Sequence, residues 1–358
     1  MTTRPPDLLA RPAAQSVRLI ALGYLDEAVQ ALQRLSDPED KEALHDFRVA
    51  LRRLRTALRA YRPHLEGSVP RRLRRRLRDV ADDTNEARDA EVALAWLRTL
   101  EQDFSARERA GLRWLISRVE HGPDHDLPEM LAEAGRSFTS VERKLRRGLE
   151  VYRRPVAVQR AAPEERFGSV ASTVLQDQAQ RLDEILATIE SRDDKAIHRA
   201  RIASKRLRYT LEPVASSLSG STDLIPRLKQ LQDLLGELHD LSELEDEVRI
   251  AMEAAAVARA DRIWELTLDD ETESPALHAA QRRKQNPGLF AVAQRSRARR
   301  DKLFRQLRAD WLERAGAWTA AVAAAVVPLE ARPVREPPAG PAKLRRRAAR
   351  PIRGARSV

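Results

Sequence analysis

The stretch that decides the fold is HDFRVALRRLR, residues 45–55, which recurs without gaps as HRARIASKRLR, residues 198–208. A second match follows in the same order, between Leu77, Asp82 and Asp89 and the later set of Leu228, Asp233 and Asp240. Its spacing differs by only two residues from that of the first match, as a change in one connecting loop would produce. Two ordered matches indicate an internal duplication, which has to be recognised before any single motif is interpreted.

Helical periodicity surrounds both copies. Apolar residues recur three and four positions apart, and the chain contains only 13 glycines. We expect helices over residues 14–35, 39–62, 69–83, 87–103, 106–120, 129–150, 166–191, 194–217, 223–236, 239–265 and 288–326. Ser36 is a candidate N-cap for the helix that carries the first copy, and Asp193 or Asp194 for the helix that carries the second. The sequence therefore predicts an all-α protein.

The chain of 358 residues is long enough for two domains. Two prolines and mixed charge in residues 152–167 favour a boundary there. We expect a disordered N-terminus over residues 1–13, a first helical repeat over 14–160, a second over 161–328, and a disordered, basic, proline-rich tail over 329–358. The simplest interpretation of that tail, without a binding role, is a solvated extension that aids solubility.

The formal net charge of +11 is concentrated in one place. Residues 331–358 hold nine Lys or Arg and one Glu, so this tail contributes +8 and the rest of the chain about +3. An anion site in the folded part must therefore arise from segregation of charge onto chosen faces. The absence of cysteine excludes disulfides and thiolate metal sites, and it fits a reducing cytoplasm.

The sequence favours neither secretion nor a membrane span. Residues 1–15 contain no apolar segment of the length that a signal peptide needs. The longest apolar stretch, residues 315–327, is too short to cross a bilayer as a helix. We therefore expect a cytoplasmic protein with no membrane partner, and the oligomeric state stays open.

Each copy of the repeat is expected to form a helix with one basic face and one apolar face. With His45 as reference, Arg48, Arg52, Arg55 and Arg59 fall within about 80° of one another and of that histidine. Phe47, Leu51, Leu54 and Leu58 lie on the opposite face, which must pack in a core. The second copy repeats the pattern, with His198, Arg201, Lys205 and Arg208 on one side and Ala203, Leu207, Leu211 and Val214 on the other.

Like charges at this spacing repel one another, so something must compensate them. The second stripe carries no carboxylate before Glu212, whereas a solvated face would normally interleave acidic residues. Guanidinium groups match phosphate oxygens, and a stripe of roughly 20 Å suits an extended phosphate chain better than a single phosphate. A lone histidine or a bare arginine stripe is more often structural or solvated, and the duplication is what favours a binding site here.

The pattern His-x-x-Arg-x-x-x-basic-basic-x-Arg, present twice, resembles the CHAD domain. The segments LQDLLGELHD at 231–240 and EARDAEV at 86–92 are similar to the loops that follow the third helix in each half of that family. The resemblance covers residues 14–328. It departs at Asn85, which stands where the second copy has Gly236, and at Arg88, which corresponds to His239.

The resemblance implies two antiparallel four-helix bundles related by pseudo-twofold symmetry, with a central basic groove that binds inorganic polyphosphate. The ligand groups it implies are His45, Arg48, Arg52, Arg53, Arg55, His198, Arg201, Lys205, Arg206 and Arg208, with Arg78 and Lys229 as weaker additions. Asp89 and Asp240 are interpreted as helix caps or arginine partners. Binding would serve targeting to polyphosphate granules or their regulation, and no cofactor or metal is implied.

Three alternatives to a polyphosphate-binding module remain. A metal-dependent phosphate-chain hydrolase needs metal-holding carboxylates, and the catalytic CYTH domain that often accompanies this family is expected to be absent, because Glu245, Glu247 and Arg249 only approximate its signature. Nonspecific nucleic-acid binding is the main rival, although aromatics are only 4% and Tyr209 alone adjoins a stripe. A partner-binding scaffold would show acidic residues along the groove.

Overall fold

The chain folds as an all-α protein, as the periodicity predicts. The computed structural model describes residues 8–37, 39–40, 42–120, 127–150, 165–190, 193–219, 221–268, 286–314 and 316–330. Within these ranges the backbone forms helices and turns, and the only β-type pairing is an isolated bridge between Pro12 and Arg166. No helix in the same ranges combines the length and the apolarity that crossing a bilayer requires.

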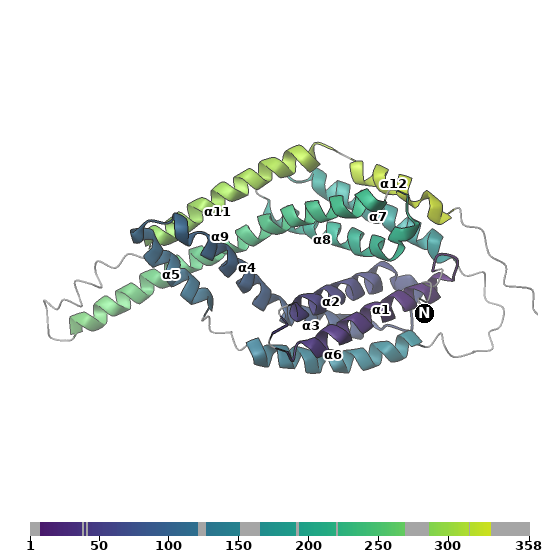
Figure 1. Cartoon of the computed structure of the whole chain (residues 1–358), viewed down its shortest axis with the longest axis horizontal. Coiled ribbons are helices and arrows are strands. Elements are labelled where there is room, and N and C mark those ends of the chain that lie inside the picture. The colour runs from purple at the N-terminus through teal and green to yellow at the C-terminus, as the bar shows by residue number, and fades with distance from the viewer. Residues whose placement is uncertain are drawn as a thin grey trace, which may run out of the picture.

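Four helices of the N-terminal half pack as one group, and they lie together in the lower part of Figure 1. They are α1 (Ala13–Arg34), α2 (Ala43–Ala60), α3 (Arg71–Asp83) and α6 (Leu127–Leu149). Helix α1 contacts α2 and α6, and α3 contacts the same two helices, so the group closes around its own apolar faces. Phe47 of α2 lies at its centre, with its ring edge-on to Phe138 of α6 at 5.2 Å.

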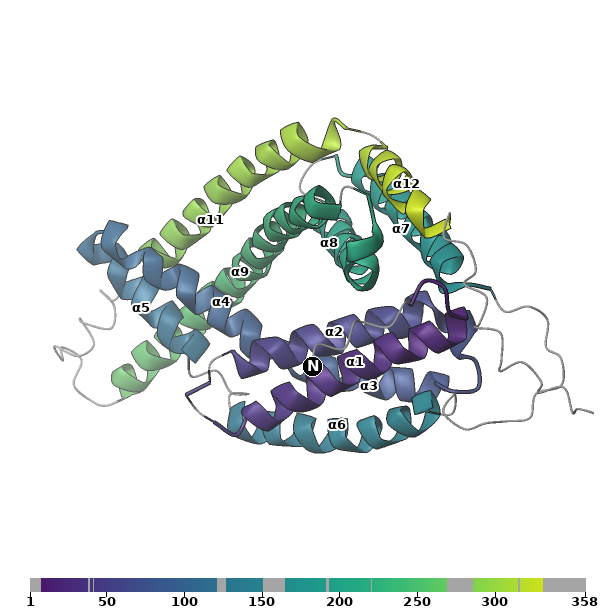
Figure 2. The ribbon, with the colours of Figure 1, turned by 45° about the vertical axis from the view of Figure 1, so that its right-hand side comes forward.

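A second group of four helical segments packs together in the C-terminal half. It consists of α7 (Phe167–Ala187), α8 (Asp194–Leu211), the first part of α9 (Ser221–Leu268) and α12 (Ala317–Glu330). The two groups meet where α2 contacts α8 and α1 contacts α7, and one continuous core of buried residues runs through both. Figure 2 shows α8 and α9 facing α2 across this junction. Descent of the two groups from a duplication, with pseudo-twofold symmetry, stays a prediction.

A third cluster, which the sequence did not lead us to expect, lies away from this junction. Helices α4 (Asn85–Thr99), α5 (Ala106–Glu120) and α11 (Asn286–Leu307) pack there with the second half of α9. They bury a separate core that includes Leu97, Leu112, Leu244 and Leu289. Gly288 permits a close approach between α11 and α5, because a Cβ there would lie 2.1 Å from the carbonyl oxygen of Glu108. The cluster places α4 against α9.

Four short helical segments complete the described part of the chain. They are η1 (Arg62–Leu65), η2 (Glu101–Asp103), η4 (Glu212–Ser217) and the π-helical turn η5 (Arg308–Leu312). The expected single helix over 288–326 is wrong, because η5 and the left-handed Gly316, with φ 74°, separate α11 from α12. The expected break after residue 236 is also wrong, because α9 continues through it.

The expected domain limits correspond only partly to the structure. Residues 1–7, 151–164 and 331–358 lie outside the described residues, so the boundary at 160/161 and most of the tail lie there too. The expectation of disorder over 1–13 is wrong for its last part, because Leu9 is buried and its carbonyl oxygen accepts a hydrogen bond from Gly168 N at 3.1 Å. Leu329 is likewise buried within α12, ahead of the tail.

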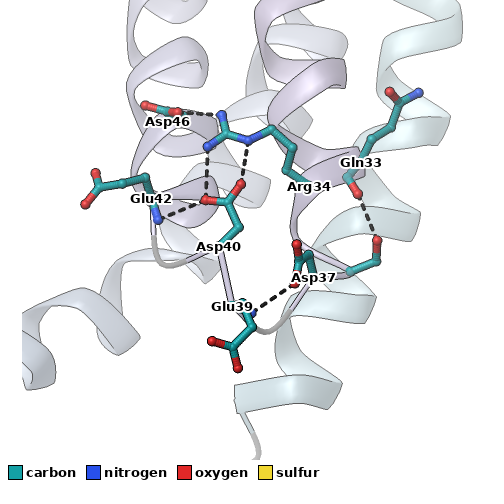
Figure 3. Close-up of polar contacts among 8 residues, drawn as sticks. Gln33, Arg34, Asp37, Glu39, Asp40, Glu42 and Asp46 are labelled. Carbon is teal, nitrogen blue, oxygen red and sulfur yellow. Dashed lines mark hydrogen bonds and ion pairs between the residues drawn. The ribbon is translucent and has the colours of Figure 1, made fainter.

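The connection between α1 and α2 fixes where α2 begins (Figure 3). Arg34 donates to Asp40 at 2.7 Å and to Asp46 at 2.6 Å, and it holds the pKa of the Asp40 carboxyl below its usual value. The expected N-cap, Ser36, instead donates to the carbonyl oxygen of Gln33 at the end of α1, so that prediction is wrong. The matching prediction for α8 is confirmed, because the Asp193 carboxylate accepts from Ala196 N at 2.9 Å.

Candidate anion-binding site

Helices α2, α4, α8 and α9 line an open cavity of about 600 Å³ between the two helix groups, which we call the central cavity. Its lining includes residues that the sequence singles out from both copies of the repeat. Each stripe contributes one side: about 10 Å along α2 between residues 45 and 52, and about 10 Å along α8 between residues 201 and 208. The predicted residues that line the central cavity are His45, Arg48, Arg52, Arg201, Lys205, Arg208 and Lys229.

The remaining wall comes from α4 and α9. Val92, Ala93 and Trp96 of α4 form an apolar side, continued by Leu241 and Leu244 of α9. Helix α9 is tied to α8 by a buried hydrogen bond, in which Gln232 Nε2 donates to the carbonyl oxygen of Ser204 at 2.8 Å. This hydrogen bond holds α8 and α9 together where both line the cavity.

The lining of the central cavity holds more cationic than anionic side chains. Six Lys or Arg side chains and three carboxylates, those of Asp233, Glu237 and Asp240, line it. Burial lowers the pKa of Lys205 to about 7, and the nearby charges of Arg201 and Arg52 act in the same direction. Asp240 opposes this shift only in part. The part of this shift that comes from Arg201 and Arg52 reflects neighbouring positive charge, which an anion in the cavity would offset.

The carboxylates of the cavity are partly engaged by arginines. Glu237 accepts from Arg299 of α11 at 2.6 Å, which draws one of the three acidic groups towards a cation that does not line the cavity. An Asp240 oxygen lies 4.0 Å from Arg201 Nη2, which fits the interpretation of Asp240 as an arginine partner. Its interpretation as a helix cap is wrong, because it lies inside α9. The side chain of Asp89 lies outside the described part.

Two of the arginines present donor groups that are shielded from water. Arg48 is buried, with 7% of its surface exposed, and its charge is therefore held inside the protein. Arg201 is half-buried, and its Nε atom is buried without a hydrogen-bond acceptor among the described residues. The Arg201 Nε donor would gain free energy if an oxygen anion reached it, because an unmade hydrogen bond of a buried donor is costly.

Five of the predicted ligand residues do not line the central cavity. Arg53 is held by two carboxylates, with its Nε 2.9 Å from Glu212 and its Nη1 3.3 Å from Glu27. His198 packs edge-on against His239, with ring centroids 4.8 Å apart, and burial followed by the charge of His239 lowers its pKa. These contacts give both residues protein partners, and their role as ligands stays a prediction.

Arg55, Arg78 and Arg206 also lie outside the lining. Arg55 Nη1 is 3.5 Å from Asp82, and Arg78 pairs with Asp79 at 3.3 Å. Arg206 is half-buried, and burial together with neighbouring arginines lowers its pKa to about 10. It therefore remains charged at neutral pH.

Sequence reasoning missed several residues of the cavity. Trp96 could not be found, because no part of the repeat contains it and its helix reaches the cavity only through the third cluster. Asp233 corresponds to Asp82 in the repeat, and this correspondence is the feature of the sequence that could have drawn attention to it. Tyr209 does line the cavity, but it is buried and the Arg208 guanidinium carbon lies 4.9 Å from its ring centroid. The side chain of Arg88 is outside the described part.

Comparisons with known proteins agree with this architecture. The CHAD domain crystal structure from the plant Ricinus communis is similar at a TM-score of 0.51 and 20% identity, over 88% of this chain and 93% of that chain. PptA from Streptomyces chartreusis is similar at 0.50 and 18% identity, over 83% of this chain and 99% of that one. No curated protein matches the sequence. The CHAD domain family model matches residues 23–249, which is more than half of the chain, so the protein belongs to the CHAD domain family.

Proposed function

We propose that the central cavity binds inorganic polyphosphate without changing it chemically. The observation that carries this proposal is the convergence of six Lys and Arg side chains, from three different helices, on one cavity. Each cation can give a phosphate oxygen a charge-assisted hydrogen bond, which contributes about 1.5–3 kcal/mol. Attachment to polyphosphate granules would follow from such binding.

The shape of the site favours a chain of phosphates over a single one. Arg48 and Arg52 lie one helical turn apart on α2, and Arg201, Lys205 and Arg208 extend along α8 for a similar length. One phosphate cannot reach cations spread over about 10 Å, whereas successive phosphates of an extended polymer can. The three carboxylates of the cavity limit where the polymer can lie, because they repel any part of it that comes close to α9.

Nucleic acid is supported less well than polyphosphate. Single-stranded nucleic acid binds by stacking its bases on exposed aromatic rings. Tyr209 is buried beneath Arg208, which leaves the half-buried Trp96 as the other aromatic residue of the lining. The site therefore offers donors for phosphate and little surface for bases.

A hydrolase is also supported less well. Metal-assisted phosphoryl transfer needs several carboxylate or histidine ligands around one point. The described ranges contain no group of three or more His, Asp or Glu side chains placed to hold a metal ion. Glu237 is drawn towards Arg299, and Asp240 lies near Arg201, so these two carboxylates have cationic neighbours of their own.

A titration of the whole chain against long-chain polyphosphate, duplex DNA and ATP, at equal phosphate concentration and moderate salt, tests the proposal. We expect polyphosphate to bind most tightly, with an affinity that falls steeply as salt rises. Arg52→Glu combined with Lys205→Glu removes two donors at the centre of the cavity. Binding should weaken at least about 100-fold, as the loss of two charge-assisted bonds implies.

The matched control carries the same change in charge outside the cavity. Arg249 and Arg262 are exposed on the far half of α9, so Arg249→Glu with Arg262→Glu should change the affinity far less. Circular dichroism checks that both double variants keep their helices. The proposal fails if duplex DNA binds more tightly than polyphosphate, or if the cavity variant is folded and binds as well as its control.

A further inference from the structure

The second half of α9 has two apolar faces, and one of them is buried. Val248, Ala251 and Ala255 pack in the third cluster against residues of α5 and α11. The opposite face carries four large apolar side chains that are exposed, those of Ile250, Val257, Trp264 and Leu268. We call these four residues the exposed stripe.

The spacing of the exposed stripe is that of a coiled coil. Ile250, Val257 and Trp264 recur every seven residues, and Ala254 and Leu268 lie four residues after the first and the last of them. At about 100° per residue, the four members of the stripe lie within about 40° of one another on the helix. An apolar pattern with this period is the kind that packs against a second helix. Figure 1 shows that this end of α9 projects beyond the other helices.

The exposed stripe is large for the surface of a folded chain. Trp264 is 66% exposed, Leu268 67% and Val257 60%. By these fractions the stripe presents on the order of 400 Å² of apolar surface, which is the size of patch that marks an interaction site. Two copies that cover each other's stripes and the residues beside them bury roughly 1,000 Å², which reaches the lower limit for a specific interface.

One polar residue in the heptad pattern decides how two copies can pair. Asp261 stands four residues after Val257, where the pattern places an apolar residue. A parallel pair of α9 helices, in which each residue faces its own copy, would bring two Asp261 carboxylates together. In an antiparallel pair with its two-fold axis at Val257, Asp261 faces the small Ala254 of the other copy instead. Ile250 then packs against Trp264 of the other copy, and Val257 against its own copy.

We propose that this chain forms an antiparallel two-fold dimer through the exposed stripe of α9. A two-fold dimer uses the same patch on both copies, which is the commonest way in which soluble chains associate. Glu253, beside the stripe, faces the small Ala260 of the other copy in the same register. The stripe lies beyond the residues that line the central cavity, so the inference does not depend on what the cavity binds.

Sedimentation equilibrium of the full chain, between about 1 and 100 µM, tests the proposal. We expect dimers whose fraction rises with concentration. Val257→Glu should weaken self-association at least about 100-fold, because it sets two carboxylates face to face on the two-fold axis. Val257→Lys should do the same, and an equal mixture of the two variants should associate again. The matched control is Ala256→Glu, at an exposed position turned about 100° from the stripe, which should dimerise as the wild type does. A wild type that stays monomeric, or a dimer that Val257→Glu leaves intact, overturns the inference.

Single cysteines test the orientation, because the chain has none of its own. Val257→Cys should form a disulfide between two copies, since the two-fold axis brings its Cα atoms to about the 6 Å that a disulfide spans. In the antiparallel pair the two copies of position 250 lie about 20 Å apart. Ile250→Cys should therefore form a disulfide with Trp264→Cys in a mixture and not with itself. Rapid self-linking of Ile250→Cys would show a parallel pair and refute the antiparallel dimer.

Discussion

Helices α2 and α8 carry the same sequence pattern, and yet they pack differently. Helix α2 buries the large residues Phe47 and Leu51, whereas the matching positions of α8 hold Ala200 and Ser204, which are also fully buried. Ser204 is tied to α9 through its carbonyl oxygen, which accepts from Gln232. Helix α2 thus packs against its neighbours through large apolar side chains. Helix α8 instead packs through small residues and is joined to α9 by a hydrogen bond.

The electrostatic roles of the two helices differ as well. Arg52 and Lys205 occupy matching positions and line the same cavity, and burial brings the pKa of the lysine to about 7. The neighbouring residues Arg53 and Arg206 match in the same way, and only Arg53 lies between carboxylates. The repeated motif therefore determines where a side chain lies, while residues of other helices determine whether its charge is paired.

The largest effect expected from this comparison concerns packing. Phe47→Ala removes a fully buried ring that contacts Phe138, and it should lower the free energy of unfolding by about 3–5 kcal/mol. Ala200→Phe, the reverse change in the second copy, overfills a small site and should cost about 1–3 kcal/mol. Urea denaturation measures both. A cost below about 1 kcal/mol for Phe47→Ala would show that this part of α2 is not tightly packed.

Much of the site could be predicted from the sequence because it lies on single helices. His45, Arg48 and Arg52 share a face at any reasonable helical twist, so their joint presence in the cavity follows from local geometry. The contribution of Trp96 could not be predicted, since it depends on how α4 leaves its bundle to join the third cluster. The same holds for Glu212, whose distance from Arg53 depends on the contact between α2 and α8.

The continuity of α9 shows how packing can override a local signal. The expected helices end at residue 236 and begin again at 239, and a glycine such as Gly236 within a helix costs about 1 kcal/mol. The apolar residues Leu235, Leu238, Leu241 and Leu244 nevertheless continue the helical spacing across this point, and all four are buried. Burial of these four side chains outweighs the cost of one glycine. The first half lacks this continuity, because Thr84 separates α3 from α4 and donates to the carbonyl oxygen of Ala81 at 2.9 Å.

A smaller effect is expected from the difference between Arg52 and Lys205. With a pKa of about 7 in the free protein, Lys205 loses its proton as the pH rises above neutrality. A bound polyanion favours the charged form, so binding takes up a proton and the affinity should fall by about 10-fold between pH 7 and 9. Arg201, Arg52, Arg208 and Asp240 act on this group and keep their charges throughout that range.

Lys205→Arg is the matched control, because arginine stays charged over the whole range. The variant should lose most of the pH dependence, and calorimetry in buffers of different ionisation enthalpy should detect fewer protons taken up on binding. The free wild-type protein should itself become more stable from pH 7 upwards, since the unfolded chain holds the Lys205 proton more tightly than the folded one. Parallel pH profiles for the variant and the wild type would show that another group is responsible.

The smallest effect concerns the beginnings of the two helices. Asp193 caps α8 by accepting from Ala196 N at 2.9 Å, whereas Glu42, the N-cap residue of α2, makes no capping side-chain hydrogen bond and Ser36 bonds to the end of α1 instead. Asp193→Ala should therefore cost about 1 kcal/mol of stability. Ser36→Ala should leave the start of α2 unaffected, because the contacts of Arg34 with Asp40 and Asp46 fix the α1–α2 connection. Equal losses in thermal denaturation would mean that both helices depend on their caps alike, and the difference drawn here between their N-termini would then be wrong.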